Sequence, residues 1–395
     1  MRQVFGICLW LLATFVSASE FEPAKIELKE RLFFRPTLEL ELGHDDNLLN
    51  TGGDSLSSSF MRVSPDLWLT WGRRISHIRT HYQLDATSYF DSSADNYVDH
   101  LFDVIGHHEF TARHRIDGEY QYQRGHEERG TGLAEFVVLA EPIEYSKHRV
   151  ELGYGFGAEA AKMQIGVKLG FEDRKYENFR RDLTEYRDYD DVSYGADVSW
   201  RLGQRTSLLF DGRYSDRRYD RINPLGSSRD SSTLRFLTGV SWEASGKTEG
   251  RVTFGLEEKN FDDGNREDFS GFSWDVGVIW RPRSYSTVEL SSARAAKDPF
   301  TAGDYVAESV YQLGWTHYWR ERIATQLDYR FENDDYTGVS REDDIHSVHF
   351  GVIYEFRRWL KFEPYIHYYD RSSSRALDAI NYDKSRFGLL ATIAM

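Results

Sequence analysis

Apolar and polar residues alternate along most of this chain, so that every second position is apolar. Between residues 163 and 172, for example, Met163, Ile165 and Val167 are separated by polar or small residues. The same alternation recurs in residues 36–42, 77–90, 274–280 and 387–395. Because successive side chains of a strand point to opposite faces, this pattern predicts strands with one apolar and one polar face. From residue 36 to the end we therefore expect an all-β protein.

Short turns divide the strands into long hairpins. The turns lie near residues 72–74, 113–115, 158–160, 203–205, 245–247, 282–284, 320–322 and 357–358. Their spacing of about 40 residues fits two membrane-length strands, at about 3.3 Å per residue, plus one longer loop. The longer loops are polar and often acidic. Eight turns separate nine hairpins and predict about 18 strands, unless a further hairpin within residues 133–140 changes the count by two.

An aromatic residue precedes each short turn, with the same parity as the apolar residues of its strand. A soluble barrel has no reason to repeat an aromatic at one height, whereas rings at the headgroup level of a bilayer form a girdle. The predicted membrane-interface aromatics are Trp71, Phe110, Phe156, Trp200, Trp242, Trp280, Trp319 and Phe356.

The second face of the strands carries many charges. In a packed dry core each of them would need a partner, whereas a barrel of 16–18 strands is wide enough to hold a water-filled lumen. The predicted pore-lining residues are Arg62, Arg79, Glu119, Glu151, Lys168, Arg213, Arg235, Arg251, Glu289, Asp328 and Glu363. The fold class that follows is a transmembrane antiparallel up-and-down β-barrel with short periplasmic turns and longer, acidic extracellular loops.

Composition and the N-terminus agree with export to the cell outer membrane. Of 395 residues 15% are aromatic, too many for a disordered chain, and a mean hydropathy of −0.60 excludes a bundle of spanning helices. Residues 1–18 resemble a signal peptide with cleavage after Ala18, and they contain the single cysteine, Cys8. Residues 19–35 form a periplasmic segment, either an arm or a partial plug, and residues 36–395 form the barrel.

Candidate chemistry is sparse. On a strand His77 and His81 lie about 13 Å apart, too far to share one metal ion. Residues 246–248 resemble the end of a phosphate-binding loop, but Ser241 stands where that motif requires glycine. No catalytic residue, metal ligand or cofactor is therefore predicted, and an enzyme of the outer-membrane lipase type is kept only as an alternative. The formal net charge of −15 argues against a nucleic-acid partner.

Several short motifs resemble a family of β-barrel porins found with exopolysaccharide gene clusters (EpsL/VpsM/Wzp-like). They are Gly43-His44-Asp45-Asp46-Asn47-Leu48, Arg62-Val63-Ser64-Pro65, Tyr82 with Tyr89, and Gly125-His126-Glu127-Glu128-Arg129-Gly130. The resemblance implies a channel that passes exopolysaccharide or capsular polysaccharide across the outer membrane. It also implies a periplasmic polysaccharide-export protein as partner and a glycan as cargo.

Three functions remain open from the residues themselves. A lumen of mixed charge suits a glycan better than an ion filter, which needs a ring of one sign. A general or solute-specific diffusion porin needs a loop that folds inward, and residues 125–144 are the candidate. A surface-binding barrel would need aromatic loops, whereas the loops here are acidic.

The acidic loops suit an outer surface that shares divalent ions with lipopolysaccharide, with dedicated calcium sites as the alternative.

Overall fold

The computed structural model describes residues 25–224, 226–244, 246–375 and 380–394. The predicted signal peptide, residues 1–18, lies outside the described residues. Within them, no helix is both long enough and apolar enough to cross a membrane.

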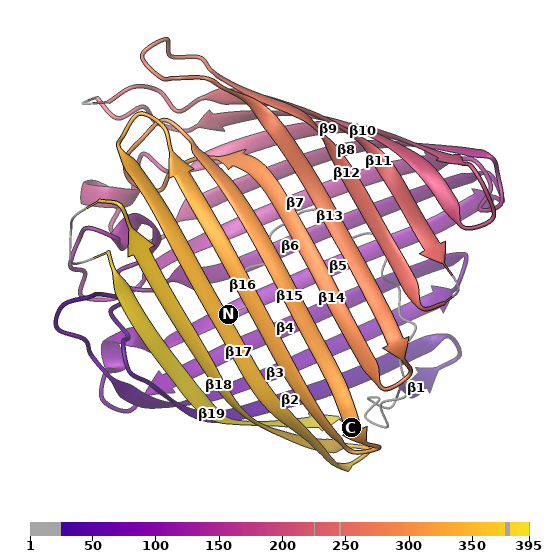
Figure 1. The fold of residues 1–395 in the computed structure, drawn as a ribbon, viewed down its shortest axis with the longest axis horizontal. Helices are drawn as coiled ribbons and strands as arrows, with labels where there is room; N and C mark the ends of the chain where they lie inside the picture. Colours follow the sequence, from indigo (N-terminus) through magenta and orange to yellow (C-terminus); the bar gives the residue numbers. More distant parts are fainter. Residues whose placement is uncertain (1–24, 225, 245, 376–379, 395) are drawn as a thin grey trace.

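Antiparallel strands form a closed barrel of 18 strands, in which the last strand pairs with the first (Figure 1). Each strand pairs with its neighbours in the sequence, which is the up-and-down order that the alternation predicts, and the predicted fold class is confirmed. The strands are β2 (Leu32–Asp45), β3 (Ser58–Arg73), β4 (Ser76–Tyr89), β5 (Tyr97–Thr111), β6 (His114–Glu127), β7 (Ile143–Phe156), β8 (Met163–Tyr176), β9 (Tyr189–Arg201), β10 (Thr206–Tyr219), β11 (Ser231–Ala244), β12 (Thr248–Phe261), β13 (Phe269–Arg283), β14 (Ser286–Lys297), β15 (Val306–Arg320), β16 (Ile323–Tyr336), β17 (Arg341–Arg357), β18 (Leu360–Ser373) and β19 (Tyr382–Ala394).

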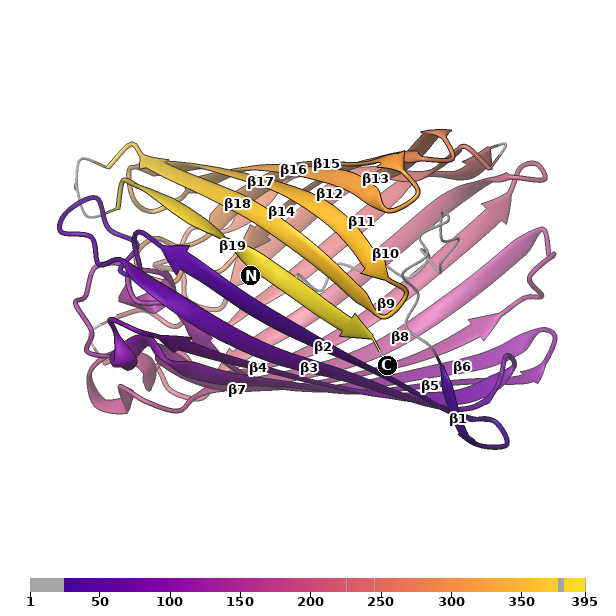
Figure 2. The ribbon, with the colours of Figure 1, turned by 90° about the horizontal axis from the view of Figure 1, so that it is seen from below.

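The short turns gather at one end of the barrel and the long loops at the other (Figure 2). Gly72 and Gly157, with φ of 122° and 114°, occupy backbone conformations in these turns that a side chain would strain. The suggested extra hairpin is absent, because residues 133–140 contain no strand and Gly132–Ala134 form a single 3-10 turn.

A short strand precedes the barrel. β1 (Ile26–Lys29) pairs with β2 from Ile26↔Phe34 to Lys29↔Leu32, and β19 pairs with β2 from Thr37 onward. β1 thus lies beside β2 just beyond the end of β19, at the end of the barrel that holds the short turns. Residues 26–35 of the predicted N-terminal segment therefore contribute β1 and the beginning of β2.

The alternation separates the two faces of the wall. On β8, Val167 and Leu169 are 48% and 55% exposed, and the neighbouring Lys168 carries an ion pair with Glu151 of β7. An exposed apolar belt is what a bilayer requires of the outer face, since lipid cannot hydrate polar groups.

The predicted interface aromatics all lie at the turn ends of their strands, beside the apolar belt. Trp71 and Trp319 are about 60% exposed, and Trp242 is half-buried. A girdle at the headgroup level remains our prediction for these residues.

Candidate functional site

The polar face encloses the lumen, and five of the predicted pore-lining residues meet there. They line one shallow hollow on the inner side of β7–β13, and they are Glu151, Lys168, Arg213, Arg235 and Arg251. Glu151 lies 3.7 Å from both Lys168 and Arg213. Asp197, Asp211 and Asp275 line the same hollow. Both signs of charge therefore alternate around this part of the wall.

Arg62 is the centre of a second network, on β2–β4. Its guanidinium lies 3.1 Å from Glu39, 2.6 Å from Glu41 and 2.9 Å from Asp85. Glu41 also accepts a hydrogen bond from Arg386 of β19, at 3.0 Å. The network thus bridges the seam where β19 closes the barrel on β2.

The remaining predicted pore-lining residues are spread around the ring rather than brought together. Each lies on the polar face: Arg79 at 5.8 Å from the Trp68 ring, Glu119 opposite Glu151, Glu289 and Asp328 on either side of Gly314, and Glu363 at 3.4 Å from His349. A continuous pore-lining set remains a prediction for these residues.

Two polar clusters resemble metal sites in their residue types. His81 lies between Asp66 and Asp103, at 3.0 and 2.9 Å, so both ring nitrogens are engaged by carboxylates. A second cluster has the carboxylates of Glu308, Glu332 and Asp334 within 4.8 Å of one another. The ammonium of Lys297 lies 2.5, 3.5 and 3.1 Å from these three carboxylates, so a lysine supplies the cation there.

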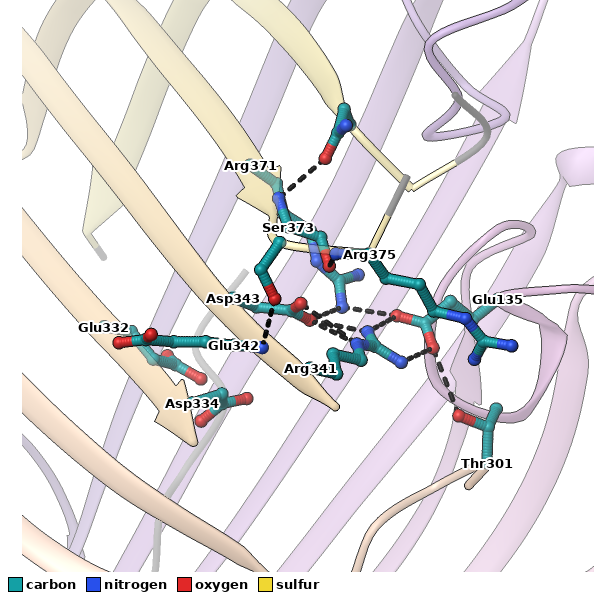
Figure 3. A network of polar contacts seen from close by, with 12 residues as sticks. Glu135, Thr301, Glu332, Asp334, Arg341, Glu342, Asp343, Arg371, Ser373 and Arg375 are labelled. Carbon is teal, nitrogen blue, oxygen red and sulfur yellow. Dashed lines mark hydrogen bonds and ion pairs between the residues drawn. The ribbon is translucent and has the colours of Figure 1, made fainter. Parts of the chain in front are cut away.

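The loop between β6 and β7 comprises residues 128–142, and we name it the crossing loop. It folds into the end of the barrel that holds the long loops, which we call the outer mouth, and crosses the lumen. Its Glu135 accepts hydrogen bonds from Arg341 of β17, one of them at 2.8 Å, and from Arg371 of β18 (Figure 3). Strands β19, β2, β3, β4 and β5 stand between β18 and β6 in the ring, so the contact joins distant parts of the wall. The crossing loop lies within residues 125–144, the candidate inward loop of a diffusion porin; residues 125–127 and 143–144 of that range belong to β6 and β7.

Asp343 completes this contact, and we name Glu135, Arg341, Asp343 and Arg371 the latch. Asp343 lies 2.5 Å from Arg341 and 2.8 Å from Arg371. The side chains of Arg341 and Asp343 are fully buried, and those of Glu135 and Arg371 are less than 10% exposed. Two arginines and two carboxylates balance, which is the condition under which buried charges are tolerated.

Further contacts anchor the base of the crossing loop. The amide of Asn50, in the loop after β2, donates to Arg129 O at 2.9 Å, and Lys384 of β19 lies 3.3 Å from Glu128. Burial raises the pKa of Glu128, but Lys384 and then His126 outweigh it and lower this pKa to about 2. Gly130 has φ of 75°, and a β-carbon there would collide with the Leu49 carbonyl.

An apolar cluster fixes the first turn of the crossing loop against the wall. Leu133 and Ala134 are buried on Ile143 of β7 and Tyr176 of β8. Burying a leucine side chain contributes roughly 1.5–3 kcal/mol. The crossing loop is therefore held at its base, at this apolar cluster and at the latch.

A second inward loop, residues 298–305 between β14 and β15, meets the crossing loop. The hydroxyl of Thr301 donates to Glu135 at 3.2 Å (Figure 3). At the start of the loop, Asp298 lies 2.8 Å from both Arg217 of β10 and Lys259 of β12. The outer mouth is thus narrowed by two loops that touch at Glu135.

Sequence reasoning missed the latch and the second inward loop. The positions of Arg341, Asp343 and Arg371 on the polar face, near the outer ends of their strands, were a signal available in the alternation. Nothing local to Glu135 indicates that it crosses to strands more than 200 residues away.

Comparison with known proteins places this architecture in a family. No curated protein matches the chain. Among solved structures, the apoprotein form of the FrpB iron transporter from Neisseria meningitidis is similar, with a TM-score of 0.47, 13% identity, and coverage of 86% of this chain and 61% of that one. The siderophore receptor PirA from Pseudomonas aeruginosa has a TM-score of 0.46 and 9% identity, with coverage of 91% and 80%.

The copper transporter OprC has a TM-score of 0.49 and 12% identity, with coverage of 93% of this chain and 65% of that one. The chain spans less than two thirds of the FrpB structures that it matches, and likenesses of this size carry no argument about its activity. The family model described as "Putative beta-barrel porin 2", in contrast, matches residues 32–394, which is the whole barrel. The chain therefore belongs to this β-barrel porin family.

Proposed function

We propose that this porin is an outer-membrane channel, without enzymatic activity, that passes exopolysaccharide or capsular polysaccharide across the outer membrane. The observation that carries the proposal is the lumen wall, where carboxylates and guanidinium groups alternate, as around Glu151, Lys168 and Arg213. Such a wall offers donors and acceptors to sugar hydroxyls without selecting one sign of ion. The motifs shared with EpsL/VpsM/Wzp-like porins support the same cargo.

Outward transport of a glycan needs an energy source and partners. The chain has no nucleotide-binding motif, so we assign the driving force to a periplasmic polysaccharide-export protein that contacts the short turns and the β1 hairpin. The outer surface would lie among lipopolysaccharide, whose divalent ions can bridge to the acidic loops. An extended glycan could leave only if the crossing loop moves aside from the latch.

The crossing loop favours a second candidate, a diffusion porin for a solute. A loop fixed across the mouth sets an upper limit on solute size, which suits passive entry of small molecules. The two functions make opposite demands on the loop. Export requires it to open, whereas a diffusion porin works with the loop closed.

A deletion strain tests both candidates. Export predicts that deletion sharply reduces extracellular polysaccharide and leaves small-solute uptake unchanged, and that plasmid-borne wild-type protein restores secretion. Unchanged surface polysaccharide under producing conditions would refute export. Normal polysaccharide together with slowed uptake of one solute, restored by complementation, would establish the diffusion porin instead.

A further inference from the structure

A cavity lies at the outer end of the barrel, between the loops that follow β8, β10 and β12. Its volume is about 100 Å³, which is below the roughly 300–1,000 Å³ of a site that encloses a whole small molecule and suits a single group such as a carboxylate. Four arginines line it, together with Tyr186 and Tyr219. Arg221 pairs with Glu185 at 3.4 Å, which leaves Arg187, Arg229 and Arg266, one from each of the three loops. A concentration of arginines is unexpected in a chain with a net charge of −15.

Two of these arginines have no carboxylate partner among the described residues. Arg187 donates to the carbonyls of Pro299 and Thr301 at 3.3 and 3.4 Å, and Arg229 donates to the same two carbonyls at 3.0 and 3.2 Å. A carbonyl accepts a hydrogen bond but carries no full negative charge. The positive charges of both side chains therefore remain unbalanced within the described part of the chain.

The third arginine is more deeply buried. The side chain of Arg266 is 7% exposed, and its Nε atom has no hydrogen-bond partner in the described residues. Its Nη1 lies 3.2 Å from Gly303 O and 3.5 Å from Asp304. The other nearby carboxylate, Asp298, is already engaged at 2.8 Å by Arg217 and Lys259.

Burial is the main reason that the charged forms of the two loop arginines are disfavoured. Burial, and next the positive charge of Arg187, lower the pKa of Arg229 to about 10. Burial also lowers the pKa of Arg187 from its ordinary value. Each cation is therefore destabilised chiefly by burial, and a bound anion would stabilise its charged form.

We infer that this cavity binds the carboxylate of an acidic sugar, such as a uronate residue of a saccharide at the outer mouth. Guanidinium groups pair with carboxylates through two parallel hydrogen bonds, and tyrosine rings offer an apolar face to a sugar ring. The hydroxyl of Tyr219 already donates to Asp298, at 3.0 Å. The inference deepens the proposed glycan function and rests on it for the choice of a saccharide. The unbalanced arginines support an anion site by themselves.

The site also touches the second inward loop. The two carbonyls that Arg187 and Arg229 hold belong to Pro299 and Thr301, and the hydroxyl of Thr301 donates to Glu135 in the latch. A carboxylate competes well for the same guanidinium donors because charged hydrogen bonds are stronger than neutral ones. An acidic sugar in the cavity would therefore loosen the second inward loop.

Binding to the purified, detergent-folded full chain tests the inference. The probes are trigalacturonate, neutral maltotriose and inorganic phosphate, titrated by calorimetry at low ionic strength. The variants are Arg187→Gln and Arg229→Gln. The matched control is Arg218→Gln, which removes the same charge from an arginine that is already paired with Asp216 and Asp262. Heat-modifiable mobility confirms that every variant is folded.

Trigalacturonate should bind, maltotriose should not, and each of the two variants should weaken binding about tenfold or more while the control does not, since one charged hydrogen bond corresponds to that factor. Arg229→Lys, which keeps the charge but loses the planar fork, should fall between wild type and Arg229→Gln. Equal binding of phosphate and trigalacturonate would overturn the assignment to a sugar. Undiminished binding in both variants would overturn the site itself.

The outcome is separable from that of the deletion experiment. Trigalacturonate binding by the purified barrel stands even if deletion leaves polysaccharide secretion intact, because it reports on the cavity alone. Loss of secretion without trigalacturonate binding would leave the export proposal in place and refute this inference.

Discussion

Replacing Glu135 by glutamine keeps the shape of the side chain and removes the charge that fastens the crossing loop to the far wall. In the wild type, Glu135 faces Arg341 and Arg371, and all three side chains are less than 10% exposed. In the variant, Asp343 alone would face two buried guanidinium groups. With the loop closed, the latch of the variant therefore carries an uncompensated positive charge, and burial of that charge raises the free energy of the closed state.

The size of the effect follows from that imbalance. Breaking one side of a buried ion pair costs about 3–5 kcal/mol when the remaining charge stays buried. The cost falls on the closed loop only, because an open loop lets water reach both arginines. At about 1.4 kcal/mol per factor of ten, the ratio of open to closed mouths should rise roughly a hundredfold to several thousandfold. Leu133 should stay packed on Ile143, so we expect the tip of the loop to move rather than the whole loop.

Single-channel conductance in planar bilayers measures this opening. Glu135→Gln should conduct more than the wild type and admit larger neutral sugars in liposome swelling, with unchanged heat-modifiable mobility. Glu342→Gln is the matched control, because Glu342 lies next to Asp343 but is exposed and bonds to Asn333 at 2.9 Å. A Glu135→Gln channel with wild-type conductance and size limit would refute the idea that the latch holds the mouth closed.

Three further predictions concern the wall and the base of the loop. Val167→Arg should cost about 2–4 kcal/mol and reduce assembled barrel, as judged by outer-membrane yield, whereas Lys168→Ala should assemble normally. The mature protein should fractionate with the outer membrane and change its electrophoretic mobility on boiling. Recovery as a soluble periplasmic protein would contradict its insertion in the outer membrane. Because the pKa of Glu128 is lowered to about 2, its contribution is complete above the ordinary value of 4.5 and is lost as pH falls toward 2. The conductance difference between wild type and Glu128→Gln should shrink over that window.

The barrel could be predicted because its determinants are local. A strand that faces lipid on one side and water on the other must alternate, and Val167 and Lys168 show the alternation at neighbouring positions. The short turns follow from breaks in that pattern, so strand number and order followed as well. The beginning of β2 was harder to place, because residues 26–35 mix charged and apolar side chains without strict alternation.

The outer mouth could be predicted only in part because its contacts are long-range. Loop length and polarity marked residues 125–144 as able to fold inward, but the partners of Glu135 lie 206 and 236 residues away. The pairing of Glu135 with Arg341 depends on how the barrel closes and on the apolar cluster that holds Leu133. The arginines around the cavity at the outer end come from three separate loops, and each of them alone resembles an ordinary solvated loop residue.

The two inward loops meet at one hydrogen bond, from the Thr301 hydroxyl to Glu135, and this contact makes a last prediction about cooperation between them. Removing it with Thr301→Val leaves a buried carboxylate with one donor fewer, at a cost of roughly 1–2 kcal/mol. That cost corresponds to roughly a five- to thirtyfold rise in the ratio of open to closed mouths. Thr301→Val alone should therefore raise the conductance, by less than Glu135→Gln does.

Combining the two substitutions decides whether the loops act together. In Glu135→Gln the tip of the crossing loop has already left its place, so Thr301→Val should have little left to remove, and the double variant should conduct like Glu135→Gln. Comparing the wild type, the two single variants and the double variant forms a double-mutant cycle, which isolates the coupling between Glu135 and Thr301. If the two effects simply added, each loop would be held independently by its own wall contacts. Ligand binding at Arg187 and Arg229, which hold carbonyls of the second inward loop, would then not affect the latch.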